Sequence, residues 1–164
     1  MEMRRAKRQV KDLAAIQEIV NSCKICRLAM EDREGLYIVP MSPGARWDGE
    51  KLTLYFHCAG EGRKISALRA DPRCAFEMDR EWRLTGEGDK ACTYSCDYQC
   101  VTGRGTVRFV EDSREKAAAM AVIMTHQTGR AFTITEEMTR DITILALEAE
   151  TYTAKAHITT EPLE

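Results

Sequence analysis

The chain lacks both the long apolar segment of a membrane protein and the charge bias of a nucleic-acid-binding protein. Its 164 residues contain no apolar run near the ~20 residues that a membrane-spanning helix requires. The formal net charge is −2 with 30% charged residues, so nothing in the charge favours binding to nucleic acid. Its partners are therefore expected among small molecules and proteins, with no nucleic acid and no membrane.

Segments that separate domains are also missing. The chain contains no internal repeat, no low-complexity tract and no linker rich in Pro, Gly or Ser. With 44% hydrophobic residues, its length suits one domain with a proper core. The basic N-terminal tail, about residues 1–11, is not followed by an apolar core and so does not form a secretory signal. We expect a single cytoplasmic domain over residues 1–164.

Cysteine, in contrast, is abundant, and its seven copies are an odd number. An extracellular disulfide framework would favour an even set in a shorter chain. Cys23 and Cys26 form a C-x-x-C pair, yet neither a second pair nor paired histidines completes four zinc ligands. We expect reduced thiols that line a core or a pocket, and no metal site. A cluster on Cys92, Cys96 and Cys100, which recur every fourth residue, is the alternative.

The apolar pattern predicts more strands than helices. The expected helices follow Asp12, span 63–70 and follow Asp112, and the expected strands cover 25–30, 36–41, 51–57, 73–78, 99–110 and about 141–156. Residues 42–50 are expected to form a loop, and 79–96 the least regular region. Gly103 and Gly105 share one strand face, which predicts sharp curvature or a close backbone approach. The hairpin spacing favours a mainly β (α+β) fold, an antiparallel barrel with peripheral helices, over a doubly wound sheet.

The segment from Leu52 to Pro72 carries the most information about function. It predicts an apolar strand, a glycine-bearing loop, and a helix that begins with Arg63 and Lys64. A helix start has unpaired N–H groups and a positive partial charge, and the glycines let a ligand approach the backbone. These features favour a pocket for one phosphate. Solvated surface charge on an exposed helix is the alternative.

His57 ends the apolar strand beside this loop. Such a residue either makes a structural hydrogen bond or contacts a ligand, and its place beside the glycine-bearing turn favours contact. His57 is therefore the candidate catalytic residue. No Ser/Cys–His–acid arrangement stands out by its spacing, because such partners are not adjacent in sequence.

Six segments form a larger pattern. They are Cys23–Leu28, Tyr37–Met41, Leu54–Ile65, Asp71–Glu77, Tyr98–Gly105 and Glu111–Lys116. Together they resemble the pyridoxamine 5′-phosphate oxidase-like flavin-binding split-barrel proteins, and within them the nitroimidazole-resistance (Nim-like) branch. The resemblance runs from Arg4 to about His157, and the Gly-Arg-Lys triplet at 62–64 is its most specific part.

The resemblance implies an FMN-binding split barrel that forms a homodimer, with each cofactor site at the subunit interface. The FMN phosphate would bind Arg63 and Lys64. The other residues that the resemblance places at the flavin are Val39, Pro40, Met41, Ser42, Tyr55, Phe56, His57, Cys58, Gly62, Tyr98 and Gln99. FMN is expected, rather than FAD or haem.

The implied activity is that of a flavin-dependent oxidoreductase that reduces small electron-poor acceptors such as nitroaromatics and nitroimidazoles. The flavin would carry the redox chemistry, and the protein would supply position and electrostatics. True pyridoxamine phosphate oxidase activity is not expected, because the C-terminal segment 151–156 offers Lys155 alone in place of a basic cluster. A flavin- or haem-binding protein with a storage, sensing or protective role is the alternative, and the fold alone does not choose between them.

Overall fold

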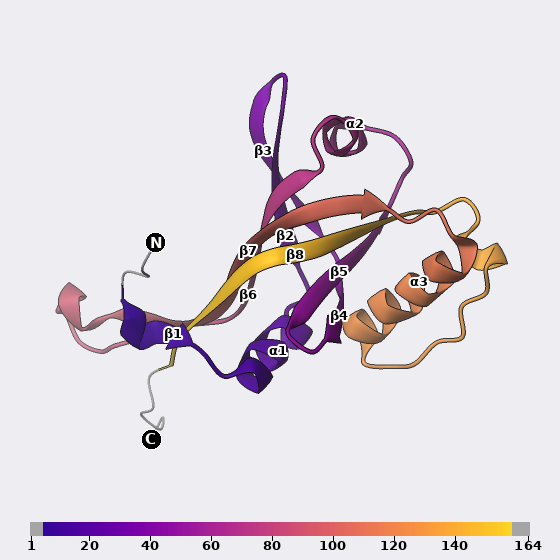
Figure 1. The fold of residues 1–164 in the computed structure, drawn as a ribbon. Coiled ribbons are helices and arrows are strands. Elements are labelled where there is room, and N and C mark those ends of the chain that lie inside the picture. Colours follow the sequence, from indigo (N-terminus) through magenta and orange to yellow (C-terminus); the bar gives the residue numbers. More distant parts are fainter. Residues whose placement is uncertain (1–4, 159–164) are drawn as a thin grey trace.

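A computed structural model describes residues 5–158, apart from the side chains at positions 81 and 82. The first four residues of the expected basic tail lie outside this range. Within it, the strands form one 8-stranded sheet in the order β3-β2-β6-β7-β8-β5-β4, with β1 paired to β8 (Figure 1). The strands are β1 Gln9–Val10, β2 Cys26–Asp32, β3 Gly35–Met41, β4 Gly44–Asp48, β5 Lys51–Cys58, β6 Arg73–Thr85, β7 Ser95–Phe109 and β8 Thr143–His157.

The pairings of this sheet are antiparallel, and β3 and β4 form its two edges, so the described sheet does not close. Three α-helices accompany it in the described range: α1 Leu13–Ser22, α2 Arg63–Ala70 and α3 Ser113–Thr128. Short 3-10 turns cover η1 Ala6–Arg8, η2 Ala91–Thr93 and η3 Glu137–Thr139. The expected split barrel with peripheral helices is therefore confirmed.

All three described α-helices start where the sequence predicts, and an aspartate caps two of them. The Asp12 carboxylate accepts a hydrogen bond of 2.8 Å from the Ala15 N–H, and Asp112 accepts one of the same length from the Glu115 N–H. Each aspartate satisfies a backbone donor that a helix start leaves unpaired. Gly129, at φ 73°, ends α3 in the left-handed conformation.

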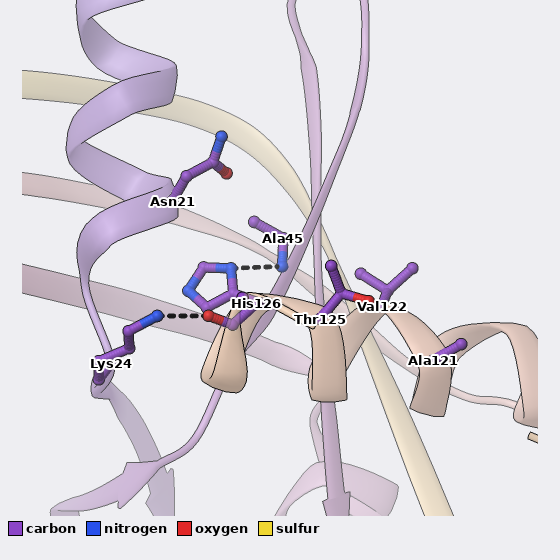
Figure 2. A pocket seen from close by; sticks show the side chains of 8 residues that line it. Asn21, Lys24, Ala45, Ala121, Val122, Thr125 and His126 are labelled. Carbon is purple, nitrogen blue, oxygen red and sulfur yellow. Dashed lines mark hydrogen bonds between the residues drawn. The ribbon is translucent and has the colours of Figure 1, made fainter. Parts of the chain in front are cut away.

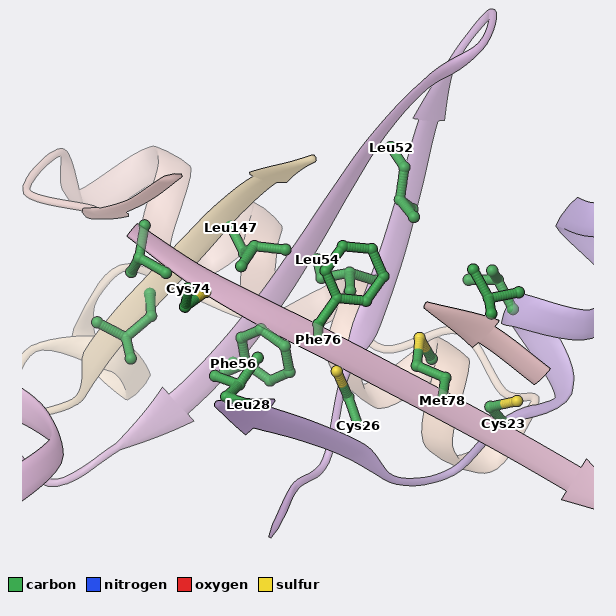
Figure 3. Close-up of a cluster of buried hydrophobic side chains, with 14 of the residues drawn as sticks. Cys23, Cys26, Leu28, Leu52, Leu54, Phe56, Cys74, Phe76, Met78 and Leu147 are labelled. Carbon is green, nitrogen blue, oxygen red and sulfur yellow. The ribbon is translucent and has the colours of Figure 1, made fainter. Parts of the chain in front are cut away.

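The main core lies between the sheet, α1 and α2. Leu28, Leu54 and Phe56 are completely buried there, beside Phe76 and Met78 (Figure 3). Cys23, Cys26 and Cys74 belong to the same cluster, so for these three the prediction of thiols lining a core is confirmed. A second, smaller cluster lies under α3 and contains Tyr55, Val110, Ala119, Ile123, Ile144 and Ala146.

Gly103 and Gly105 allow β7 to approach its neighbours closely, as predicted. A Cβ at Gly105 would lie 2.1 Å from the carbonyl oxygen of Glu148, and one at Gly103 would lie 2.5 Å from that of Thr151. The register between β7 and β8 also shifts next to Gly105. Both positions therefore exclude any larger residue in this geometry.

Of two expectations about the irregular regions, one is wrong and the other is confirmed in part. Gly44–Asp48 forms the edge strand β4, paired with β5, where a loop was expected. A Cβ at Gly44 would lie 2.5 Å from the Ile123 Cα, so this glycine serves close packing on α3. The region 79–96 is irregular in part: the register of β6 with β7 shifts between Arg80 and Arg83, and 86–94 lies outside both strands. The two strands nevertheless continue into it, where Leu84 pairs with Cys96. Backbone pairing with a neighbouring strand outweighs local propensity at both places.

Candidate functional site

Three segments that are distant in sequence meet at the start of α2. The Lys64 ammonium lies 3.3 Å from the Met41 sulfur, which connects the helix to the end of β3. Burial raises the pKa of the Cys58 thiol and the nearby Lys64 charge opposes that rise, so the end of β5 belongs to the same place. The structure thus brings together Met41, Cys58 and Lys64.

The start of α2 carries no side-chain cap. Gly62 precedes the helix with φ 110°, a conformation that favours glycine. A Cβ at Gly62 would meet nothing within 4 Å, so the backbone angle, and not crowding, requires this residue. The first intrahelical bond runs from the Ser66 N–H to the Gly62 carbonyl. We call the place where Met41, Cys58 and Lys64 meet at the start of α2 the α2 corner. The N–H groups before this first bond, together with the half-buried Lys64, make the corner electropositive.

Arg63 is held by the turn between β2 and β3. Its guanidinium donates to Asp32 at 2.7 and 2.8 Å and lies 3.3 Å from Glu34. It also lies 4.2 Å from the ring centroid of Tyr37. Hydrogen bonding to Arg63 holds the pKa of Asp32 below its ordinary value. Lys64 forms no ion pair within residues 5–158, so the two adjacent cations have different surroundings.

The predicted residues of β3 divide between its two faces. Val39 and Met41 are half-buried against the main core, whereas Pro40 and Ser42 are exposed. Successive side chains of a strand point to opposite faces, so Met41 is the member of this set whose side chain reaches Lys64.

The predicted residues of β5 divide in the same way. Tyr55 and Phe56 are 1% and 0% exposed, with Tyr55 under α3 and Phe56 in the main core. His57 is exposed and follows the face of Tyr55, whereas Cys58 follows that of Phe56. The structure therefore puts the candidate catalytic residue His57 on the opposite face of β5 from Cys58.

Tyr98 and Gln99 lie at the far end of β7 from this corner. Tyr98 pairs with His157, whereas Phe109, eleven residues later, pairs with Leu145 beside Phe56. At about 3.3 Å per residue, β7 separates Tyr98 from Phe109 by about 35 Å. Among the described residues, Tyr98 contacts Arg8 and His157, and Gln99 accepts from Arg80, so these contacts do not join either residue to the start of α2.

Two residues near this corner were not identified from the sequence as site residues. Asp32 engages Arg63, and Tyr37 has a buried hydroxyl that finds no hydrogen-bond partner among the described residues. Only the pairing of β2 with β3 brings both next to α2. Spacing along the chain carries no signal for this contact.

The cysteines do not gather into a site. Among the described residues, no group of three or more His, Cys, Asp or Glu side chains is placed to hold a metal ion, and all seven thiols are free. Burial raises the pKa of Cys23 and Cys74 to about 12. Cys92 is exposed at η2. The raised pKa values of Cys23 and Cys74 make these two thiols poor nucleophiles and poor metal ligands.

Comparison with known proteins agrees with this architecture. Residues 12–156 match the family model described as pyridoxamine 5′-phosphate oxidase. The chain belongs to this family. No curated protein matches the chain. No helix within the described range is long and apolar enough to cross a membrane.

Several solved structures are similar to this protein over most of the chain. A "putative 5-nitroimidazole antibiotic resistance protein" from Bacteroides thetaiotaomicron is 29% identical, with 90% of this chain and 86% of that chain covered and a TM-score of 0.76. The flavocytochrome Anf3 from Azotobacter vinelandii is 15% identical, with coverage of 99% and 75% and a TM-score of 0.75. An FAD and heme binding protein from Mycobacterium smegmatis is 15% identical, with coverage of 93% and 74% and a TM-score of 0.74. The last two show the shared fold.

Proposed function

We propose that this protein is an FMN-dependent oxidoreductase that reduces small electron-poor acceptors, with nitroaromatics and nitroimidazoles as the candidate class. The observation that carries the proposal is the corner at α2. There Lys64 is free of acidic partners within the described range, beside a helix start that lacks a side-chain cap. A phosphate monoester bears close to two negative charges near neutral pH and accepts several hydrogen bonds, which suits this corner.

The residues at this corner fit FMN. Lys64 and the free N–H groups of α2 would hold the phosphate, and Met41 and Ser42 would line the flavin ring. The bound flavin would supply the electron or hydride transfer, while the chain supplies position and charge. Arg63 would join the phosphate only by giving up part of its contact with Asp32.

The acceptor class is supported by the relative from Bacteroides thetaiotaomicron, whose name refers to 5-nitroimidazole resistance. The side chains near the start of α2 also agree with this chemistry, because it does not require a strong acid or base there. Cys58 is kept as a neutral thiol by burial, and His57 lies on the other face of β5. Electron delivery to an electron-poor ring needs a well-placed flavin more than a strong acid or base.

A homodimer would complete the site. Leu36 and Ile38 lie on the edge strand β3 and are 82% and 65% exposed, which is unusual for a surface that stays in water. Within one chain, Tyr98 contacts Arg8 and His157, and Gln99 accepts a hydrogen bond from Arg80, so neither is held at Lys64. We infer that the partner subunit covers β3 and that the partner's Tyr98 and the partner's Gln99 reach the flavin.

Purified protein tests the proposal directly. We expect flavin absorbance bands, saturation at one FMN per subunit, reduction by NADH or NADPH without oxygen, and reoxidation by an added nitroimidazole. Bound flavin that no nitro compound reoxidises would contradict the activity but keep the cofactor. A Soret band without flavin bands would instead support the haem-binding alternative. Failure to bind FMN at micromolar concentration would overturn the proposal.

A further inference from the structure

The connection between β3 and β4 is held by two adjacent side chains at the end of α3. The Gln127 amide donates to the Pro43 carbonyl at 2.7 Å. His126 Nδ1 accepts from the Ala45 N–H at 3.2 Å (Figure 2). Between these two bonds, Gly44 packs directly on the backbone of α3. Pro43 in the connection and Gly44 and Ala45 at the start of β4 are thus fixed on one helix.

The bonds of His126 define its charge state. Its Nε2 lies 2.7 Å from the Cys23 carbonyl, which can only accept, so Nε2 carries the proton and donates. Nδ1 faces the Ala45 N–H, which can only donate, so Nδ1 carries no proton. The ring is therefore neutral and joins the end of α1 to β4. A protonated ring would turn Nδ1–H toward the Ala45 N–H and lose that bond.

The surroundings of His126 also oppose a positive charge. The Lys24 ammonium donates to the backbone carbonyl of His126, next to the ring. Burial, with a smaller effect from Lys24, lowers the pKa of His126, while its bond to Cys23 acts in the opposite direction. On β4, Arg46 follows Ala45 and lies over the ring of Tyr55.

Protons can reach the ring from solvent. A cavity of about 540 Å³ lies beside His126 between α1, β4 and α3 (Figure 2). Its polar lining includes Asn21, Lys24 and Thr125, and none of these is acidic. Acidification therefore titrates His126 without first requiring unfolding.

We propose that His126 and Gln127 are positioning residues that hold the β3–β4 connection, and through it Met41 and Ser42, in place at the flavin ring. The hold is released when His126 takes up a proton. The expected effect on flavin binding rests on the proposed function, whereas the hydrogen bond between His126 and the Ala45 N–H does not. Met41 precedes Pro43 by two residues and already contacts Lys64, so movement of the connection would reach the cofactor site.

The first test measures amide hydrogen exchange of Ala45 in the ligand-free protein from pH 5 to 7.5, after correction for the intrinsic pH dependence of exchange. Protection should be constant above the ordinary histidine pKa of about 6.5 and should fall about fivefold to tenfold at lower pH, the effect of one lost hydrogen bond. His126→Gln keeps a donor and an acceptor but does not titrate, so its protection should not depend on pH. His126→Ala should be poorly protected throughout.

His157→Gln is the matched control. His157 is also half-buried and bonded to one side chain, Ser95, but lies far from β4. This variant should behave like the unmodified protein. Ala45 protection that stays the same in acid, or that varies equally in His126→Gln, would overturn the inference whether or not flavin binds.

The second test measures riboflavin affinity over the same pH range. Riboflavin is the probe because it lacks the phosphate, whose own titration near pH 6 would affect FMN binding. The dissociation constant should rise several-fold in acid for the unmodified protein and stay level for His126→Gln. Gln127→Ala should weaken riboflavin binding at every pH. If riboflavin binds with the same pH profile in all these proteins, the link to the flavin site is wrong.

Discussion

Arg63 donates from Nε and Nη2 to the two carboxylate oxygens of Asp32, at 2.7 and 2.8 Å. This paired geometry is the strong form of an arginine–carboxylate contact. The neighbouring Lys64 points instead to the Met41 sulfur. At the start of α2, the charge of Arg63 is thus neutralised by Asp32, whereas Lys64 has no acidic partner among the described residues. The two cations should therefore not contribute equally to binding an anion.

Lys64→Ala is expected to weaken FMN binding more than Arg63→Ala. A lost charge-assisted hydrogen bond costs about 1.5–3 kcal/mol, which corresponds to a tenfold to hundredfold rise in Kd for Lys64→Ala. Arg63→Ala should raise Kd by less, because a phosphate has to compete with Asp32 for that guanidinium. Fluorescence titration with FMN measures both changes.

Two controls accompany this comparison. Arg69 lies on the same helix with its guanidinium over Phe109, so Arg69→Ala should leave the affinity unchanged. Riboflavin, which has no phosphate, should bind all three variants with nearly equal affinity. An equal loss of riboflavin binding in Lys64→Ala would mean that this lysine does not contact a phosphate.

Asp32→Asn is expected to strengthen FMN binding. The substitution removes the negative charge that holds Arg63 but keeps the size of the side chain, so the guanidinium becomes available to the phosphate. We expect Kd to fall several-fold for FMN and to stay constant for riboflavin. The double variant Asp32→Asn/Arg63→Ala should lose the gain. A gain that persists in the double variant would show that Arg63 does not mediate it.

Local sequence features predicted the parts of the molecule that depend on local chemistry. The Asp12 and Asp112 caps follow from side-chain acceptors within three residues of the donors that they satisfy. Glycine weakens the interior of a strand and often marks a place where another backbone approaches closely. Gly103 and Gly105 on one strand face therefore predicted the close approach that the structure has. The start of α2 at Arg63 follows in the same way from Gly62.

Contacts between distant segments could not be predicted in this way. His126 bonds the carbonyl of Cys23, 103 residues away, and Arg63 bonds Asp32 across 31 residues. Neither pair has a spacing that identifies it, because the contact arises from how helices and strands pack. The same limit applies to Tyr98, whose position relative to Lys64 depends on the registers of β3, β2, β6 and β7.

Gly105→Ala is expected to destabilise the fold without touching the candidate site. The new Cβ would lie 2.1 Å from the Glu148 carbonyl oxygen, so β7 and β8 would have to separate locally. Overpacking of this kind lowers the free energy of unfolding by about 1–3 kcal/mol. Chemical denaturation measures the loss. Gly60→Ala is the control, because its Cβ would meet the Thr143 hydroxyl at 3.2 Å, which a small shift relieves. Equal stability of the two variants would contradict the packing argument.

Ile38→Glu is expected to dissociate the proposed dimer. The side chain is 65% exposed on the edge strand β3, so the charge is tolerated in a single chain but buried if a second subunit covers this face. Sedimentation should show monomers at micromolar concentration, with FMN affinity reduced in parallel and the melting temperature little changed. Met138→Glu, at a side chain 60% exposed on η3, should remain dimeric. A variant Ile38→Glu that sediments like the unmodified protein would place the interface elsewhere.

Mixed dimers decide whether each site draws on both subunits. If Lys64 comes from one subunit and the partner's Tyr98 from the other, a dimer of one Lys64→Ala chain and one Tyr98→Ala chain has one intact site and one doubly defective site. Such dimers, purified with two affinity tags, should bind one FMN per dimer with the affinity of the unmodified protein, although each variant alone binds weakly. If both residues served the same site from one chain, every site in the mixed dimer would carry one defect. Titration would then show no high-affinity binding, and the proposed shared-site arrangement would be wrong.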